Sequence, residues 1–143
     1  MSETTANVHE SCLCMDLRSV AHQLTRRYDE ALAPSGLSIT QFAQLRQLLT
    51  AEQPTVKDLA EASGLDRSTL GRNIKVMERM GLVSVSVGKD ARTRTINVTP
   101  EGLSAFKQAE PLWQAVQLEL KTDLGAGGRG LLDHLLGSLS GGK

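Results

Sequence analysis

The sequence predicts a mainly α-helical protein with one small β-hairpin, and three observations carry this prediction. Apolar residues recur at helical spacing over residues 11–34, 38–51 and 100–124. Residues 55–81 form two short amphipathic segments with a glycine, Gly64, between them. Residues 82–98 alternate valine or isoleucine with polar residues on either side of a basic tip. Two short helices followed directly by a hairpin are typical of a winged helix-turn-helix.

The first two helices are bounded by recognisable end signals. Leu13, Leu17, Val20 and Leu24 form the apolar stripe of the first helix, and the Pro34-Ser35-Gly36 turn ends it. Ser38 is a suitable N-cap for the second helix, which we expect to run to about Ala51.

The next two helices have the spacing of a helix-turn-helix. Thr55 with Asp58 three residues later is an acidic variant of the capping box. Ala60 is small enough to let two helices cross closely, and Gly64 allows positive φ in the turn. Asp66 is a suitable N-cap for the second helix of the pair.

The hairpin and the C-terminal helices complete the prediction. Residues 82–87 form the first strand, and Ile96 and Val98 mark its partner. Thr99-Pro100-Glu101 begins a fifth helix. We expect Pro111 to kink this helix, Gly125 to Gly130 to break it, and residues 131–139 to form a short sixth helix.

Length and composition limit the class of protein. A chain of 143 residues suffices for one domain, 1–143, with a real core, and 3% aromatic residues leave aliphatic side chains to build most of it. No apolar run approaches the ~20 residues of a membrane span, and no basic segment followed by an apolar stretch opens the chain. We therefore expect a cytoplasmic protein. The chain has no catalytic triad, no paired-carboxylate motif and no phosphate loop, so we expect neither an enzyme nor a bound cofactor.

The distribution of charge is uneven although the formal net charge is +0. Between Asp66 and Arg94 there are seven basic and three acidic residues, a local charge of +4 that the rest of the chain balances with −4. A local basic patch on a neutral protein suits salt-sensitive DNA binding. A solvated charged surface is the alternative, and charge alone does not exclude it.

The helix that follows Asp66 has two contrasting faces at ~100° per residue. Leu70, Ile74 and Met77 share one face and are expected to pack on the domain. The opposite face is polar near its start and basic further along. In a helix-turn-helix the N-terminal part of such a helix meets base edges. We assign Ser68 and Thr69 to bases or phosphate, Arg72 to guanine, Val76 to a thymine methyl, and Lys75 and Arg79 to phosphate. An amphipathic surface helix with a solvated basic face is the alternative.

The tip of the hairpin, residues 88–94, carries Lys89, Arg92 and Arg94. An arginine on a projecting turn gains from the negative potential of a minor groove. Asp90 would repel phosphate if it pointed outward, and we expect it to support Arg92 or an arginine of the preceding helix. For Lys89 and Arg94 an ordinary exposed hairpin is the alternative.

These residues resemble the MarR family of bacterial transcriptional regulators along nearly the whole chain. The matching pieces are Gly36-Leu37, Leu59-Ala60, residues 65–69, Gly81-Leu82-Val83, Asp90-Ala91-Arg92 and residues 97–102, in the expected order. The resemblance implies a homodimer joined by residues 11–34 and 100–140, with residues 38–99 as the DNA-binding region. It also implies a pseudo-palindromic double-stranded DNA site, a minor-groove role for Arg92, and repression released by a small ligand or an oxidant. A ligand would bind in the cleft between the dimer helices and the winged region.

The two cysteines, Cys12 and Cys14, lie too close together for a disulfide framework. Cys14 and Tyr28 resemble the reactive cysteine and a thiolate-binding tyrosine of the branch of this family that senses organic hydroperoxides. Ile39 stands where that branch usually has a second tyrosine. The alternatives are two small apolar residues at the dimer interface, and a metal site with His9 and His22 that lacks a clear fourth ligand. We assign no metal.

Overall fold

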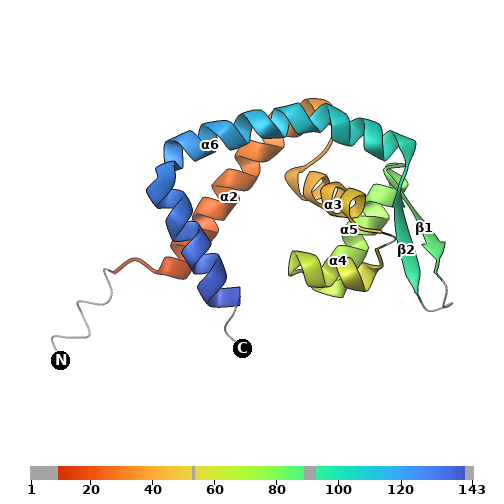
Figure 1. Cartoon of the computed structure of the whole chain (residues 1–143), viewed down its shortest axis with the longest axis horizontal. Helices are drawn as coiled ribbons and strands as arrows, with labels where there is room; N and C mark the ends of the chain where they lie inside the picture. The colour runs from red at the N-terminus through yellow and green to blue at the C-terminus, as the bar shows by residue number, and fades with distance from the viewer. Residues whose placement is uncertain (1–9, 53, 89–92, 141–143) are drawn as a thin grey trace.

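The computed structural model describes residues 10–52, 54–88 and 93–140. Figure 1 shows α3, α4, α5 and the hairpin at one end of the molecule, and the start of α2 with the end of α6 at the other. The mainly helical fold with one antiparallel hairpin is the predicted one. Its elements in chain order are α2 (Leu13–Leu32), the 3-10 turn η2 (Ala33–Ser35), α3 (Ile39–Thr50), α4 (Val56–Ser63), α5 (Arg67–Arg79), β1 (Val83–Val87), β2 (Arg94–Val98) and α6 (Pro100–Ser140).

The helix ends follow the predicted local signals. Ser38 and Gln41 form a complete capping box at the start of α3, and Thr55 and Asp58 form another at the start of α4. Gly64 ends α4 with φ 72°, a left-handed conformation that favours glycine. These ends fix the turn between α4 and α5, and therefore the direction in which α5 leaves the domain.

Hydrogen bonds join the two strands of the hairpin to each other and join β2 to the segment before α4. β1 and β2 pair antiparallel with Val83 opposite Val98 and Val85 opposite Ile96. An isolated bridge joins Thr55 to Thr95, and the Ile96 backbone N–H donates to the Pro54 carbonyl oxygen at 3.1 Å. The start and middle of β2 are therefore held against the start of α4.

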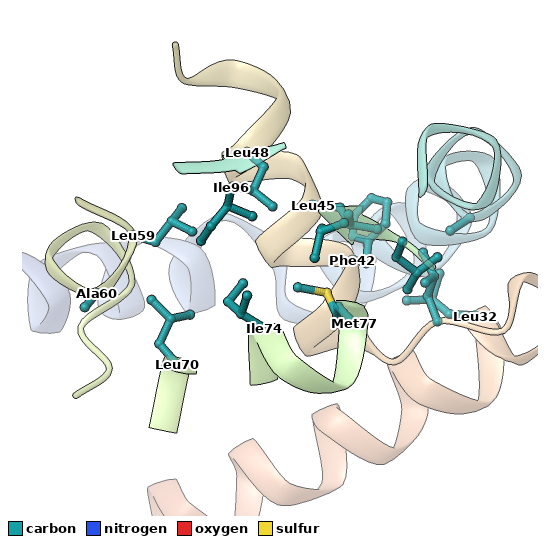
Figure 2. Close-up of a cluster of buried hydrophobic side chains, with 14 residues drawn as sticks. Leu32, Phe42, Leu45, Leu48, Leu59, Ala60, Leu70, Ile74, Met77 and Ile96 are labelled. Carbon is teal, nitrogen blue, oxygen red and sulfur yellow. The ribbon is translucent and has the colours of Figure 1, made fainter. Parts of the chain in front are cut away.

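The core lies between α3, α4, α5 and the hairpin, with contributions from the end of α2 and from α6, and most of its side chains are aliphatic (Figure 2). Leu45, Leu70 and Met77 are fully buried. From α6, Phe106 stacks on Phe42 with ring centroids 4.9 Å apart. Aliphatic side chains build most of this core, as the low aromatic content predicts.

The prediction for the C-terminal helices was partly wrong. α6 is helical from Pro100 to Ser140 except at Gly125, whose φ of 67° and ψ of 179° separate two helical segments. The break is thus one residue rather than the stretch Gly125 to Gly130. A glycine in a helix costs only about 1 kcal/mol relative to alanine, so the other glycines can stay helical. Residues on both sides of Pro111 keep helical φ and ψ, and the kink there stays a prediction.

The helices at the far end expose many apolar side chains. The exposed residues of α2 are Leu13, Met15, Leu17 and Val20, and those of α6 include Leu118, Leu124, Leu131, Leu132, Leu136 and Leu139. α2 meets α6 through an ion pair between Arg27 and Glu119 at 3.3 Å and a hydrogen bond from the Tyr28 hydroxyl to Gln117. In the described part of the chain, no helix combines the length and the apolar character that a membrane span requires.

Candidate nucleic-acid interface

Asp66 fixes the start of α5, the helix that the sequence predicts to contact DNA bases. Its carboxylate accepts hydrogen bonds from the Thr69 backbone N–H at 2.7 Å and the Ser68 hydroxyl at 2.8 Å. These two donors, the backbone N–H first, lower the pKa of Asp66 to about 2. The cap is therefore ionised at neutral pH, and it holds the Ser68 and Thr69 side chains in place on the first turn.

The two faces of α5 separate as predicted. Leu70, Ile74 and Met77 are buried against the domain (Figure 2). The side chains expected at DNA lie on the other side: Ser68, Arg72, Lys75, Val76 and Arg79 are exposed, and Thr69 is half-buried. The Arg72 guanidinium donates to the Thr69 hydroxyl oxygen at 3.3 Å. The exposed face is thus polar at its start and basic toward its end.

The wing is described up to its tip. The Gly88 backbone N–H donates to the Thr93 carbonyl oxygen at 2.6 Å, which closes the two strands below the tip. Lys89, Asp90 and Arg92 lie outside the described residues. Arg94, which begins β2 opposite Val87, is exposed next to the tip.

Lys57 and Arg67 received no role from the sequence, yet both lie beside this interface. With Thr55, Val56, Thr93 and Arg94 they line a hollow of about 380 Å³. Lys57 precedes the basic segment 66–94, so a count of charge along the chain does not find it. The bridge between Thr55 and Thr95, together with the hydrogen bond from the Ile96 backbone N–H to the Pro54 carbonyl oxygen, brings the start of α4 close to Arg94.

The residues considered for redox chemistry do not meet within one chain. Cys12 and Cys14 are both exposed at the start of α2. Tyr28 lies fourteen residues further along the same helix, about 21 Å from Cys14 at 1.5 Å per residue. Its hydroxyl donates to Gln117, and burial raises its pKa while Arg27 opposes the shift. A contact of Tyr28 with Cys14 would therefore need a second copy of the chain. Within residues 10–52, 54–88 and 93–140, no three potential metal-ligating side chains gather, and His9 lies outside those ranges.

A separate cleft lies between α3 and α6, away from α5. Its two adjoining hollows, of about 450 and 580 Å³, share Arg46 and Trp113. The Arg46 guanidinium carbon lies 4.7 Å from the centre of the Trp113 ring, and Lys121 and Arg129 line the second hollow. A cationic cleft with an aromatic wall suits a small anionic ligand.

Comparison with known proteins places this architecture among DNA-binding regulators. A family model described as MarR family matches residues 35–93. The M. tuberculosis transcriptional regulator MosR, solved in complex with DNA, is 41% identical with a TM-score of 0.82 over 91% of this chain and 96% of that chain.

More distant relatives share the same architecture. AbsC, a MarR family transcriptional regulator from Streptomyces coelicolor, is 26% identical with a TM-score of 0.77 over 90% of each chain. A mutant of E. coli MarR complexed with operator DNA is 24% identical with a TM-score of 0.79, over 89% of this chain and 92% of that chain, and supports the fold alone. No curated protein sequence matches the chain.

Proposed function

Because the chain belongs to the MarR family of transcriptional regulators, we propose that it is a dimeric, sequence-specific DNA-binding repressor. The observation that carries the proposal is the exposed polar and basic face of α5, opposite the buried Leu70, Ile74 and Met77. A relative that is 41% identical over nearly the whole chain was solved with DNA. The family's members regulate transcription, so we assign no catalytic role.

In this proposal the side chains of α5 divide the work of recognition. Ser68, Thr69 and Arg72 in the first half of the helix, and Val76 further along it, meet base edges, and Lys75 and Arg79 hold phosphates. Lys89 and Arg92 of the wing meet the minor groove and the adjoining backbone, with Asp90 supporting Arg92.

Residues 11–34 and 100–140 form the dimer interface, and residues 38–99 form the DNA-binding region. The exposed leucines of α2 and α6 support this division, because a soluble monomer rarely leaves so many together in water. A two-fold dimer places its two α5 helices about 34 Å apart on a pseudo-palindromic site.

Two substitutions separate base reading from phosphate contact. Arg72→Ala should cost about 1–3 kcal/mol on DNA from the region upstream of the protein's own gene, and little on a mixed-sequence duplex. Lys75→Ala should weaken binding to both duplexes alike. Lys107→Ala, on the exposed surface of α6, is the matched control. Wild-type affinity for the upstream duplex in both α5 variants would refute the assignment of α5.

The site at which a signal causes release of DNA lies outside α5 in this proposal. The cleft between α3 and α6 supports a small effector, and the cations Arg46 and Lys121 favour an anionic one, whereas Arg129 pairs with Asp133 at 3.0 Å. This cleft adjoins the helices assigned to the dimer, so a ligand there would act on the spacing of the two α5 helices.

Oxidation of Cys14 is the alternative signal, and its exposure at the start of α2 supports it. Cumene hydroperoxide would transfer one oxygen to the Cys14 thiolate, giving a sulfenic acid and cumyl alcohol. A disulfide with Cys12 would further require the helix terminus to unwind, because residues two apart point to different faces. Peroxide should then release DNA from the wild type but not from Cys14→Ser. Equal release from both proteins, or from neither, would rule out Cys14 as the switch.

A further inference from the structure

A basic hollow lies between the first turns of α4 and α5 and the start of β2. Each of these three elements contributes one cation: Lys57 from α4, Arg67 from α5 and Arg94 from β2. Among the residues that the structure describes, the remaining lining residues are Thr55, Val56 and Thr93, none of them acidic. At about 380 Å³ the hollow has ample room for a phosphate group.

The framework that gathers these cations is held by backbone contacts. The Thr55–Thr95 bridge and the Ile96 to Pro54 hydrogen bond join β2 to the start of α4. The capping box of Thr55 and Asp58 fixes the first turn of α4, where Lys57 is the second helical residue. The cap at Asp66 fixes α5 from its first residue, Arg67.

These three cations favour the binding of an anion that is not part of the protein. All three cations are exposed, and like charges brought together on a fixed framework repel one another until an anion neutralises them. Guanidinium groups donate to phosphate oxygens in pairs, and a lysine adds a point charge. The Thr55 hydroxyl oxygen accepts the Asp58 backbone N–H, which leaves its own proton to donate.

The position of the hollow identifies the anion. A second hollow of about 290 Å³ shares Val56 and Arg94 with the first and continues along α5 past Lys75 and Glu78. The two hollows form a groove between α5 and the wing. In the proposed complex α5 occupies the major groove and the wing the adjacent minor groove, so the strand that separates these grooves must pass here.

We propose that Lys57, Arg67 and Arg94 form a seat for a backbone phosphate of the DNA strand that passes between α5 and the wing. This proposal rests on the proposed DNA binding and adds three contacts to it. The seat carries no base information, so it contributes to affinity and register and leaves sequence preference to α5.

The size of the effect follows from counterion release. Each neutralised phosphate on duplex DNA changes the slope of log K against log salt by about 0.9. One seated phosphate in each of the two subunits then accounts for a slope of about 2.

The test compares wild type with the triple variant Lys57→Ala/Arg67→Ala/Arg94→Ala by fluorescence anisotropy over a range of KCl concentrations. One duplex comes from the region upstream of the protein's own gene, and the other is a mixed sequence of equal length. The slope should fall by about 2 on both duplexes, while the ratio of the two affinities stays within about twofold of wild type. A matched triple variant, Lys57→Arg/Arg67→Lys/Arg94→Lys, should keep most of the slope, and Lys107→Ala should keep all of it. Circular dichroism melting of each variant establishes that the fold is intact.

Four outcomes would overturn the proposal. A folded triple-alanine variant with the wild-type slope would show that no phosphate sits there, while the α5 assignment stands. Loss of sequence preference at unchanged slope would make these residues base readers. Binding of inorganic phosphate that the variant loses, with the DNA slope unchanged, would assign the seat to free phosphate. If the wild type prefers neither duplex and shows no salt dependence, the proposed function itself fails, and the seat with it.

Discussion

Gly102, in the first turn of α6, lies against the start of the wing, and its replacement by alanine probes that junction. A Cβ at this position would lie 2.0 Å from the Leu82 carbonyl oxygen, 2.9 Å from its carbonyl carbon and 3.0 Å from Val98 Cγ1. The same Leu82 oxygen accepts the Thr99 backbone N–H at 3.0 Å. Because the nearest atom is backbone, rotation of a side chain cannot relieve the clash.

The expected loss of stability is at the upper end of the range for overpacking. Carbon contacts are optimal near 3.5–4.0 Å, so α6 and β1 must separate by about 1 Å or more. Inserting a group into a tightly packed region costs about 1–3 kcal/mol, and a clash with backbone supports about 3 kcal/mol. With about 2.1 cal/mol/K of unfolding entropy per residue, a chain of 143 residues unfolds with about 0.3 kcal/mol/K. The melting temperature should therefore fall by about 10 °C.

The assay is thermal unfolding followed by circular dichroism at one protein concentration, since a dimer's melting temperature depends on concentration. Gly71→Ala, in the middle of α5, is the matched control, because a Cβ there meets no atom within 4 Å. It should stabilise the protein by up to about 1 kcal/mol through helix propensity. A melting temperature of Gly102→Ala equal to or above that of wild type would refute the reasoning from close approach.

Three further predictions concern charge and assembly. The pKa of Asp66 is lowered to about 2 in the folded protein, against about 3.9 in the unfolded chain. Its contribution to folding stability is therefore complete above about pH 4 and is lost as the pH falls through about 2. The difference in unfolding free energy between wild type and Asp66→Asn, measured by urea unfolding, should shrink over that window, and a difference independent of pH would contradict this origin. Glu78 lines the groove between α5 and the wing, where its negative charge would repel a DNA phosphate. Glu78→Gln should therefore bind both duplexes more tightly than wild type at low salt, and the difference should vanish at high salt because salt screens the repulsion. Unchanged affinity at low salt would place Glu78 away from the DNA backbone. Leu136 is 54% exposed on α6, and Leu136→Glu should shift the dimer toward monomer in sedimentation velocity; an unaffected dimer would remove Leu136 from the interface.

The parts of the fold that the sequence predicts well depend on chemistry within a few residues. The N-caps Ser38, Thr55 and Asp66 each accept a backbone N–H three residues later, as predicted. Gly64 takes positive φ where the turn between two crossing helices requires it. Alternating valines predict β1 because one face of the strand meets the core. None of these features needs knowledge of distant contacts.

The predictions that differ from the structure concern residues that only disfavour a helix, or contacts between residues far apart in the chain. Four glycines between residues 125 and 130 weaken a helix, but only Gly125 leaves it. The sequence does not predict that Lys57 lies near Arg94, because the two residues are brought together by a backbone bridge between the start of α4 and β2. Sequence patterns therefore identified the face of α5 but not the groove beside it, which exists only once the wing has packed against α4.

The first segment of α6, residues 100–124, contacts the wing, the cleft beside α3, and α2. Near its start Gly102 lies against the first residues of the wing. In its middle Trp113 lies under Arg46 in the cleft and 5.5 Å from Phe42, measured between ring centroids. Further along, Glu119 pairs with Arg27 of α2. Because the segment stays helical up to Gly125, a displacement at Trp113 moves both its ends. An effector in the cleft would thus reach the wing and the dimer helices through one rigid element, without touching α5.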